Sequence, residues 1–445
     1  MIATVEVTTL SDEASPAGCS LREAIDALTL GSSINGCART MIVGLGADVV
    51  TFDPALMPGE IVLNSALEPA VDLFIRGPGR ELLTISGQHA HEVFWATDAH
   101  LRIEGVTLTE GLAARPSAST GGAVFAREVT LDGVRVSNST ALDSGGGISG
   151  TRVAVRNSEI VGNQVAAGSG IGGGLSGGFV TIESSEFKEN EAGTFGGAVA
   201  AGLELSISDS LFQHNRAATG GALYVVRGNG EVVRSQFVDN DGEGAVIYQT
   251  DDSAVDDTLR LSIRQSLIVD QVVNPFGGSL FAQRQTDRMV QLSVQNTSIL
   301  TVRGIRAEAE LSLNNVTIRA MGGVSGLTLP AGSLAQLYDS IVVSDGPAAC
   351  QNQGVFPAQF NNIFSSGNCA DETRGDLVAE PMLGPLKDNG GPTASFAPLS
   401  GSPAINNGGP FCRSVDQRGL QRTDGFCDIG AIEFGAARVF DDGFE

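Results

Sequence analysis

Lysine and aromatic residues are scarce in this sequence of 445 residues. It has only two lysines, Lys188 and Lys387, and aromatic side chains make up 5% of the chain, with a single Trp. The formal net charge of −24 argues against nucleic acids and anionic membrane surfaces as partners. No uncharged apolar run reaches about 18 residues, so we expect no transmembrane helix. The start, "MIATVEV", lacks the features of a signal peptide, and we expect a mature secreted chain preceded by an added Met.

Cysteine is absent from residues 38–349 and occurs only near the two ends. The six cysteines form three couples of sequence neighbours: Cys19 with Cys37, Cys350 with Cys369, and Cys412 with Cys427. Pairing within each couple closes short loops and is the natural choice among the possible arrangements. With no C-x-x-C spacing and only four histidines, the sequence disfavours zinc and predicts disulfides formed in an oxidising compartment.

Glycine, by contrast, is abundant, with 58 residues, and Gly-Gly pairs recur in step with a second phrase, Ser-x-(Ile/Phe)-x-x-Asn. The four clean copies of this phrase place asparagines at Asn163, Asn190, Asn215 and Asn240, and apolar residues at Ile160, Phe187, Phe212 and Phe237. Looser copies end at Gln271 and Asp345. A repeat of roughly 25 residues is typical of solenoids, so these residues are interpreted as a structural ladder and not as a site.

Between the repeated phrases the chain alternates apolar and polar residues, as in "VAVRNSEI", "VTIESSEF" and "LSISDSLF". Such short strands would pair between successive coils at a spacing of roughly 4.8 Å and bury a continuous core. We expect each ladder Asn to bond to the next coil and to adopt the left-handed conformation of the bend. Gly-Gly would supply positive φ at the other turns.

The predicted fold class is therefore all-β, a right-handed parallel β-helix (β-solenoid) of about 10–11 coils. A leucine-rich repeat would need L-x-x-L-x-L, which is missing, and a propeller blade needs about 40–45 residues. We expect an N-terminal cap over residues 1–59, the β-helix over 60–345, a disulfide-stapled C-terminal cap over 346–434, and an acidic tail over 435–445. Within the first cap, "CSLREAIDAL" predicts a short amphipathic capping helix that begins with a capping box of Ser20 and Glu23.

Both ends of the chain resemble known modules. "CSLREAI" resembles the CSLREA motif that opens many secreted bacterial β-helix proteins, and residues 85–111 are similar to their first coils. The Gly-Gly-Ala and Phe-x-x-Asn phrases resemble repeats of chlamydial polymorphic membrane proteins and related adhesins. Near the end, "DNGGPTASFAPLSGSPAINNGG", "DQRG" and "CDIGAIEF" resemble the module called choice-of-anchor Q. The resemblance implies a secreted or surface-displayed bacterial β-helix, and it carries no catalytic residues that could be transferred.

The repeat lengthens after Asn240, where the acidic loop "QTDDSAVDD" is inserted. The loop contains four carboxylates, at Asp251, Asp252, Asp256 and Asp257. Oxygen ligands in a loop suit Ca²⁺, paired carboxylates suit glycoside hydrolysis, and a solvated acidic loop needs neither explanation. The neighbouring arginines Arg227, Arg234, Arg260 and Arg264 are candidate lyase bases. The three histidines within residues 89–100 lack the helical spacing of a metalloprotease.

These observations favour a non-catalytic, secreted or cell-surface protein, an adhesin-like scaffold that binds an extracellular glycan or a cell-surface partner. The alternative is a polysaccharide lyase or glycoside hydrolase that acts on an extracellular acidic glycan, in a groove beside residues 241–260. A structural protein that assembles laterally is a third class. We expect no catalytic residues and no cofactor other than Ca²⁺ at the acidic loop.

Overall fold

The structure is a computed structural model, and it confirms the predicted fold class: the chain forms a parallel β-helix of about 11 turns. It describes residues 2–13, 18–43, 46–115, 119–166, 168, 170–226, 228–243, 247–250, 259–271, 278–283, 290–422 and 426–436. The chain divides into two compact units. The N-terminal unit comprises Met1–Ser206 and Ser210–Tyr224, and the C-terminal unit comprises Ile207–Asp209 and Val225–Glu445. Among the described residues, no helix is both long and apolar enough to span a membrane.

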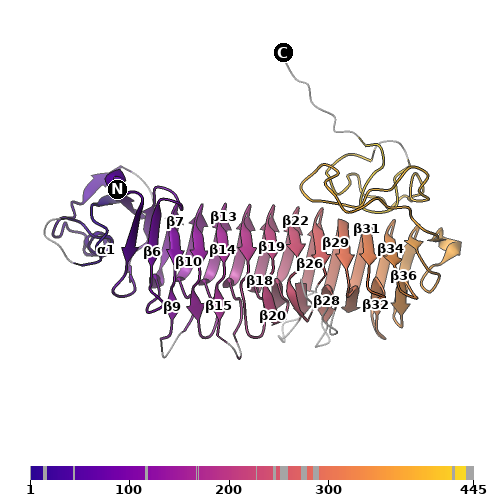
Figure 1. Ribbon diagram of the computed structural model, residues 1–445, viewed down its shortest axis with the longest axis horizontal. Helices are drawn as coiled ribbons and strands as arrows, with labels where there is room; N and C mark the ends of the chain where they lie inside the picture. The colour runs from indigo at the N-terminus through magenta and orange to yellow at the C-terminus, as the bar shows by residue number, and fades with distance from the viewer. Residues whose placement is uncertain are drawn as a thin grey trace, which may run out of the picture. The chain divides into compact units, whose positions relative to one another are not determined.

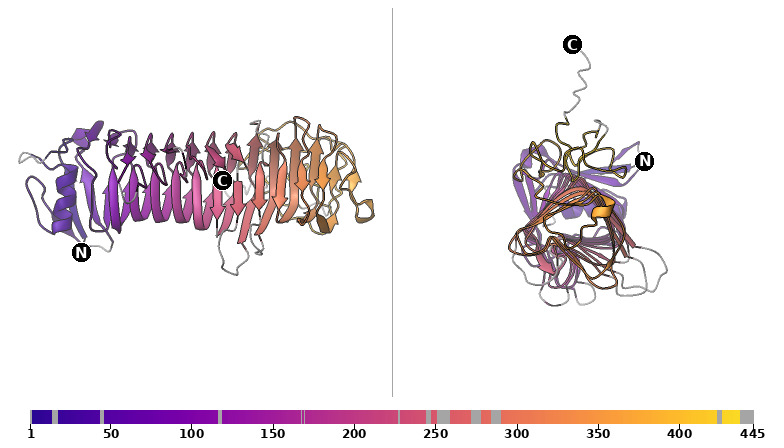
Figure 2. Two further views of the ribbon diagram at one scale, coloured as in Figure 1. Left: turned by 90° about the horizontal axis from the view of Figure 1, so that it is seen from below. Right: turned by 90° about the vertical axis from the view of Figure 1, so that its right-hand side faces the viewer.

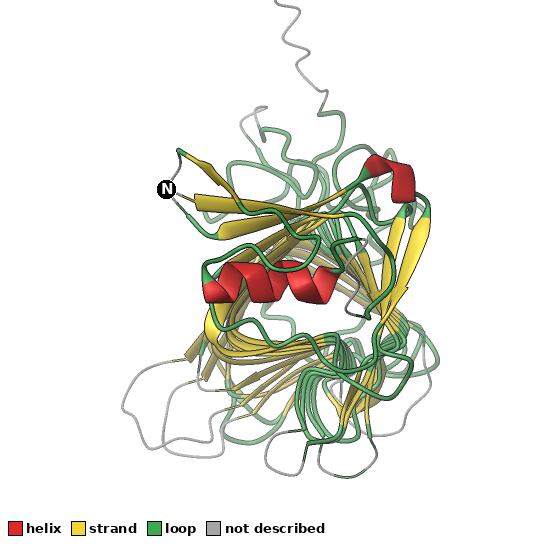
Figure 3. Ribbon diagram, turned by 90° about the vertical axis from the view of Figure 1, so that its left-hand side faces the viewer, coloured by secondary structure: helices red, strands yellow, loops and turns green. Residues whose placement is uncertain are grey.

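The helix α1 (Leu21–Leu30) lies across the open end of the first coils of the N-terminal unit (Figure 3). The Ser20 side chain accepts a hydrogen bond from the Glu23 backbone N–H at 3.2 Å, and Glu23 Oε2 accepts one from the Ser20 N–H at 3.1 Å. The predicted capping box is therefore present. The apolar side of α1 packs on β1 (Ile2–Val7) and β3 (Asp48–Phe52), which seals the core from water at this end.

The N-terminal unit is built of short parallel strands that stack coil on coil (Figure 2). The other early strands are β2 (Thr40–Ile42), β4 (Gly59–Val62), β5 (Leu73–Arg76) and β6 (Leu83–Ser86). The long strands that follow are β7 (Phe94–Glu104), β10 (Val124–Asp132), β13 (Ile148–Arg156), β16 (Leu175–Glu183) and β18 (Val199–Ser208). A second face is formed by β8 (Thr107–Thr109), β11 (Arg135–Ser137), β14 (Glu159–Val161), β17 (Glu186–Lys188) and β19 (Leu211–Gln213). The two-residue strands β9 (Leu112–Ala113), β12 (Thr140–Ala141) and β15 (Gln164–Val165) form a third, and β20 (Arg216–Thr219) and β21 (Leu223–Val226) come last.

An asparagine ladder runs along this unit, as the repeat predicts. Asn163 Nδ2 donates to Asn190 Oδ1 at 3.1 Å, and Asn190 Nδ2 donates to Asn215 Oδ1 at 2.9 Å. All three side chains are buried, so each amide is satisfied inside the core by its neighbours. Phe187 and Phe212 stack beside the ladder with ring centroids 5.2 Å apart.

One detail of the expected bend is wrong. The left-handed residue is not the ladder Asn but the residue before it, with φ of 55° at Glu189 and 53° at His214. The bend is completed at that exposed residue, and this leaves the following Asn free to turn its side chain into the core. A serine ladder runs in parallel, because the Ser158 N–H donates to Ser185 Oγ at 3.1 Å and the Ser185 N–H donates to Ser210 Oγ at 3.1 Å.

The two glycines of each Gly-Gly pair have different roles. The first has positive φ, which is 70° at Gly121 and 60° at Gly145. The second allows close approach: a Cβ on Gly122 would lie 2.1 Å from the carbonyl oxygen of Gly146 in the next coil. The pair is therefore a requirement of coil stacking and carries no chemistry of its own.

The C-terminal unit continues with the same parallel pairing. Its longer strands are β22 (Asn229–Val233), β26 (Leu259–Arg264), β29 (Val290–Thr301), β31 (Glu310–Ala320), β33 (Leu334–Tyr338) and β36 (Val355–Phe360). The second face comprises β23 (Gln236–Val238), β27 (Leu267–Asp270), β34 (Ile341–Ser344), β37 (Ile363–Phe364) and β38 (Leu377–Val378). The third comprises β25 (Ile247–Thr250), β28 (Leu280–Gln283), β30 (Ile305–Glu308), β32 (Leu327–Leu329) and β35 (Cys350–Asn352), and β24 (Asp241–Glu243) is a further short strand. Two 3-10 turns, Pro54–Leu56 in the first unit and Glu372–Arg374 in the second, complete the elements.

Residues after about 380 fold back as a loop-rich module over β29 and β31 of the C-terminal unit (Figure 1). Gln417 is fully buried; its Nε2 donates to the carbonyl of Ser266 at 3.0 Å, and its Oε1 accepts from Ser298 Oγ at 2.6 Å. Gln417 of the "DQRG" phrase is thus a docking residue of this module. Three disulfides join Cys19 to Cys37, Cys350 to Cys369, and Cys412 to Cys427.

Candidate ligand-binding groove

The acidic loop that the sequence predicts as a possible site falls outside the described residues. This applies to Asp251, Asp252, Asp256 and Asp257, and also to Arg227. Ca²⁺ binding at the loop therefore stays a prediction. The other candidate arginines contact partners on the surface: Arg234 pairs with Asp209, Arg264 pairs with Glu231, and Arg260 donates to Gln291.

The histidines occupy separate places in the N-terminal unit. His89 is exposed in the turn after β6, in a left-handed conformation with φ of 52°. His100 lies on β7, where its Nε2 is 3.1 Å from Thr130 Oγ1 in the next coil. His91 lines a separate hollow beside the N-terminal cap, which also contains carboxylates.

A hollow of about 410 Å³ lies over β7, β10, β13 and β16, within the N-terminal unit. Successive coils supply its lining, which is rich in hydroxyl groups and glycine. The hydroxyls are those of Thr97, Thr120, Ser149, Thr151 and Ser176. Its ionisable side chain is that of Arg127, and its aromatic ring is that of Phe125. We refer to this hollow as the groove.

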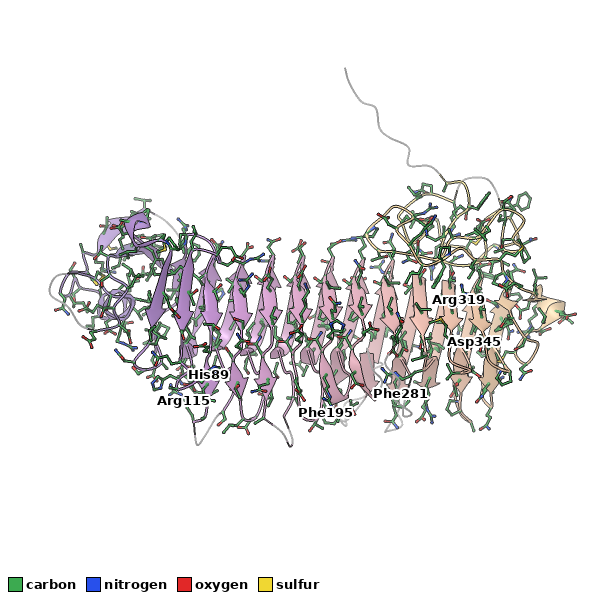
Figure 4. The ribbon with its side chains drawn as sticks, in the orientation of Figure 1. His89, Arg115, Phe195, Phe281, Arg319 and Asp345 are labelled. Atoms are coloured by element: carbon green, nitrogen blue, oxygen red, sulfur yellow. A yellow bond between two sulfur atoms is a disulfide. The ribbon has the colours of Figure 1, made fainter. Side chains whose placement is uncertain are left out.

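A stack of planar side chains ends at the groove. Arg115, which follows β9 and is labelled in Figure 4, places its guanidinium carbon 4.3 Å from the ring centroid of Trp95. Trp95 in turn stacks on Phe125, with centroids 4.3 Å apart and an interplanar angle of 22°. The coil register then places Ser149 and Ser176 at the next two positions of this row. The stack therefore stops after Phe125, and the groove opens where further rings would lie.

The floor of the groove is kept flat by glycine. A Cβ on Gly150 would lie 2.6 Å from the carbonyl oxygen of Ala126, and a Cβ on Gly177 would lie 2.8 Å from Val180 Cγ2. A side chain at Gly150 would collide with the backbone of the preceding coil, and one at Gly177 would collide with a side chain of its own strand. Backbone and small hydroxyl side chains therefore form a surface that a flat ligand can approach closely.

Like Arg319 of the C-terminal unit, Arg127 has no partner among the described residues. It is exposed on β10, and within the described residues its guanidinium makes no ion pair or hydrogen bond. Thr120 Oγ1, also at the groove, is buried and has no hydrogen-bond partner in the described part of the chain. The groove thus offers a cation and a hydroxyl whose bonding capacity is not used within the protein.

A second hollow of about 560 Å³ lies beside α1 and is lined by three carboxylates, those of Asp26, Glu68 and Glu92. Arg115 bridges two of them, at 2.7 Å from Glu68 and 2.9 Å from Glu92. Asp26 also lines the hollow, and burial raises its pKa against the lowering effect of Arg22. The hollow thus brings several carboxyl groups to one place, the residue type that glycoside hydrolysis uses.

Two buried acids, Glu433 in the C-terminal module and Asp339 in the coil on which the module docks, contribute to the packing of this region. Arg422 and Glu433 form an ion pair of 2.7 Å with side chains 1% and 2% exposed. Burial raises the pKa of Glu433 to about 7 and that of Asp339 to about 6. The sulfur atoms of Cys412 and Cys427 lie within 4.8 Å of an Asp339 oxygen, but they are joined to each other and so are not thiolate metal ligands.

Sequence reasoning missed the ring stack and the groove, although the sequence contains a signal for both. The fourth residue after the first glycine of each turn is Phe125, Ser149 and Ser176 in successive coils, counted from Gly121, Gly145 and Gly172. This position lies on the outer side of the strand, where Phe125 is half-buried and Ser149 is 8% exposed, and it does not follow the repeat. When the coils are aligned on the first glycine of each turn, Phe125, Ser149 and Ser176 fall at one position, and the residue type at this position varies from coil to coil.

Comparisons with known proteins give a structural likeness at the level of the whole chain. No family model matches the sequence, and no curated protein sequence matches it. Among solved structures, the chain is similar to the crystal structure of pectate lyase Pel9A, with 10% sequence identity and a TM-score of 0.42. The alignment covers 97% of this chain and 96% of that chain.

Proposed function

We propose that this protein is a non-catalytic, secreted or cell-surface β-helix that binds glycans, and that the groove over β7, β10, β13 and β16 is its binding site. The observation that carries the proposal is the interrupted stack: Phe125 presents a ring to a space that Ser149 and Ser176 leave open. A sugar ring could stack there as the next planar group of the row. Large rings with one apolar face supply contact area at interfaces, and hydroxyl groups fix the orientation of a bound molecule.

The lining suits a polyhydroxylated ligand in two further ways. Five side-chain hydroxyls can each donate and accept, as sugar hydroxyls do. The glycine floor lets a flat ligand approach the strands closely, because no side chains stand between them at Gly150 and Gly177. An adhesin-like scaffold that presents such a groove on a stiff stack of coils fits the repeat architecture.

The test is to fill the space at the end of the stack. Ser149→Phe places a ring at the position that follows Phe125, and the new ring should stack as Phe125 stacks on Trp95. We expect the variant to keep or raise the melting temperature and to lose binding on a glycan array and in calorimetry. Thr181→Phe, at an exposed position of β16 outside the groove, is the matched control and should bind as the wild type does.

Binding that survives Ser149→Phe unchanged would overturn the assignment of the groove. Phe125→Ala provides a second readout, because it removes the platform and leaves the floor intact. It should weaken binding without abolishing the fold, since Phe125 is only half-buried.

The second candidate function is a glycoside hydrolase or polysaccharide lyase, favoured by the hollow beside α1. There, Asp26 has a raised pKa and Glu92 is held against Arg115. A reducing-end assay and an ultraviolet assay for unsaturated products, each with and without Ca²⁺, test this on uronate-containing and neutral polysaccharides. Turnover that disappears in Glu92→Gln and Asp26→Asn would replace the binding proposal, whereas binding without turnover supports it.

A further inference from the structure

We propose that the glycan is anionic and that Arg127 is the residue that recognises its charge. This inference rests on the proposed function and adds the chemical class of the ligand. Carboxylates of uronic acids and sulfate esters share the feature that matters, a pair of oxygens that a guanidinium binds in a bidentate manner.

The first argument is the charge balance around arginine. The chain carries 51 acidic residues against 27 basic ones, so carboxylates are plentiful on its surface. Elsewhere in the N-terminal unit, Arg115 and Arg135 each contact two glutamates. Arg127 makes no such pair within the described residues, although it stands on a strand of the same sheet. Arg319 of the C-terminal unit also lacks a partner among the described residues, so it is the position of Arg127 in the groove that makes its charge available to a ligand.

The second argument is position. Phe125 and Arg127 are two residues apart on β10 and both face away from the core, although the register of β10 against β7 shifts between Ala126 and Glu128. Both line the groove. Their Cα atoms are separated by roughly 7 Å, two steps of an extended strand. This separation matches a sugar ring stacked on Phe125 with its charged substituent directed along the strand to Arg127.

The third argument is desolvation. The groove is a recess with a backbone floor and not a flat surface, so a bound sugar ring would displace water from one side of the guanidinium. Charge-assisted hydrogen bonds gain strength when water is excluded around them. A neutral glycan of the same shape would lose this contact and leave the cation partly desolvated. The groove should therefore discriminate in favour of the charged form.

The experiment compares matched ligands that differ only in charge, using the full chain. Calorimetry measures binding of oligogalacturonate and its methyl ester in one arm, and of a sulfated galactan and its desulfated form in the other. The variants are Arg127→Gln, with Arg156→Gln as the control. Arg156 is an exposed arginine of β13 paired with Glu183, so its substitution removes the same charge elsewhere.

We expect the wild type to bind the charged member of at least one pair roughly tenfold or more tightly than its neutral partner, with a preference that falls as salt rises. Arg127→Gln should abolish the preference, and Arg156→Gln should keep it. The arm that shows the Arg127-dependent preference identifies the anion as carboxylate or sulfate.

The failures of the two proposals are distinguishable. Equal binding of charged and neutral members in both arms, lost in Ser149→Phe, overturns the anionic ligand and leaves the groove as a site for neutral sugars. A preference that persists in Arg127→Gln overturns the role of this residue. Binding of no member of either pair overturns the proposed function, and this inference with it.

Discussion

In the C-terminal unit, Arg303 and Asp270 form a buried ion pair at a ladder position where the repeat has no Asn. The contribution of this pair to stability can be tested by substitution. The looser repeat placed Gln271 on the ladder, but Gln271 is exposed and Asp270 takes the buried position instead. Arg303 donates to both carboxylate oxygens of Asp270 at 2.8 Å, and to the backbone carbonyl of Gly242 at 2.8 Å. The side chains are 2% and 0% exposed.

Replacing Arg303 by Met removes the cation but leaves Asp270 buried. A carboxylate left without its partner in this way typically costs about 3–5 kcal/mol, because its desolvation is no longer compensated. For a unit of this size, that loss corresponds to a fall in melting temperature of roughly 6–20 °C. Thermal unfolding followed by circular dichroism, together with a urea titration, measures the change.

The control is the double variant Asp270→Asn with Arg303→Met. It restores an amide at the ladder position, as at Asn240, and removes both charges together. We expect its loss of unfolding free energy to be smaller than the sum of the losses in the two single variants by about 1–3 kcal/mol. If Arg303→Met alone costs less than about 1 kcal/mol, the pair is not desolvated and the reasoning fails.

Three further predictions concern the caps. Burial raises the pKa of Glu433 to about 7, above its ordinary value of 4.5, so its contribution to stability is complete below about pH 4.5 and is lost as pH rises through 7. In Glu433→Gln, the melting temperature should therefore vary less between about pH 5 and 8 than in the wild type. Parallel profiles of melting temperature against pH in the two proteins would contradict this. Replacing Cys412 and Cys427 by Ser opens a loop with a sequence separation of 15 and should destabilise the C-terminal module by about 3 kcal/mol in denaturant titration. Ser20→Ala should cost about 0.5–2 kcal/mol and increase hydrogen exchange in α1, with Ser20→Thr as the conservative control.

The fold could be predicted because the core of a solenoid repeats in the sequence. Each coil must place an apolar side chain, an amide and a tight turn at the same height, so Phe187, Phe212 and the ladder asparagines recur at nearly fixed spacing. The glycine pairs recur for the same reason. The capping helix was predictable from local rules alone, since Ser20 and Glu23 form a capping box within one turn.

Other features depend on contacts that the repeat does not encode. The left-handed conformation at Glu189 precedes the ladder Asn, and only the backbone path decides which of two neighbouring residues carries the bend. Arg303 reaches Asp270 across 33 positions of the sequence, so its role as a ladder partner cannot be read from local spacing. Gln417 docks the C-terminal module through Ser266, 151 positions away, for the same reason.

The groove follows from a different principle, which separates scaffold from site in this protein. Inward residues repeat because every coil needs them, whereas the outward row containing Phe125 and Ser149 changes from ring to hydroxyl between adjacent coils. Coil stacking does not require this change, because Phe125 stacks well on Trp95 and a third ring at 149 would add a favourable contact of about 0.5–1.5 kcal/mol. Ser149 at this position therefore leaves out a stabilising ring contact that the coil could have made. A lower local stability of this kind is expected at a binding site, where a ligand supplies the missing contact, and it favours Ser149 over the ladder residues as part of the site.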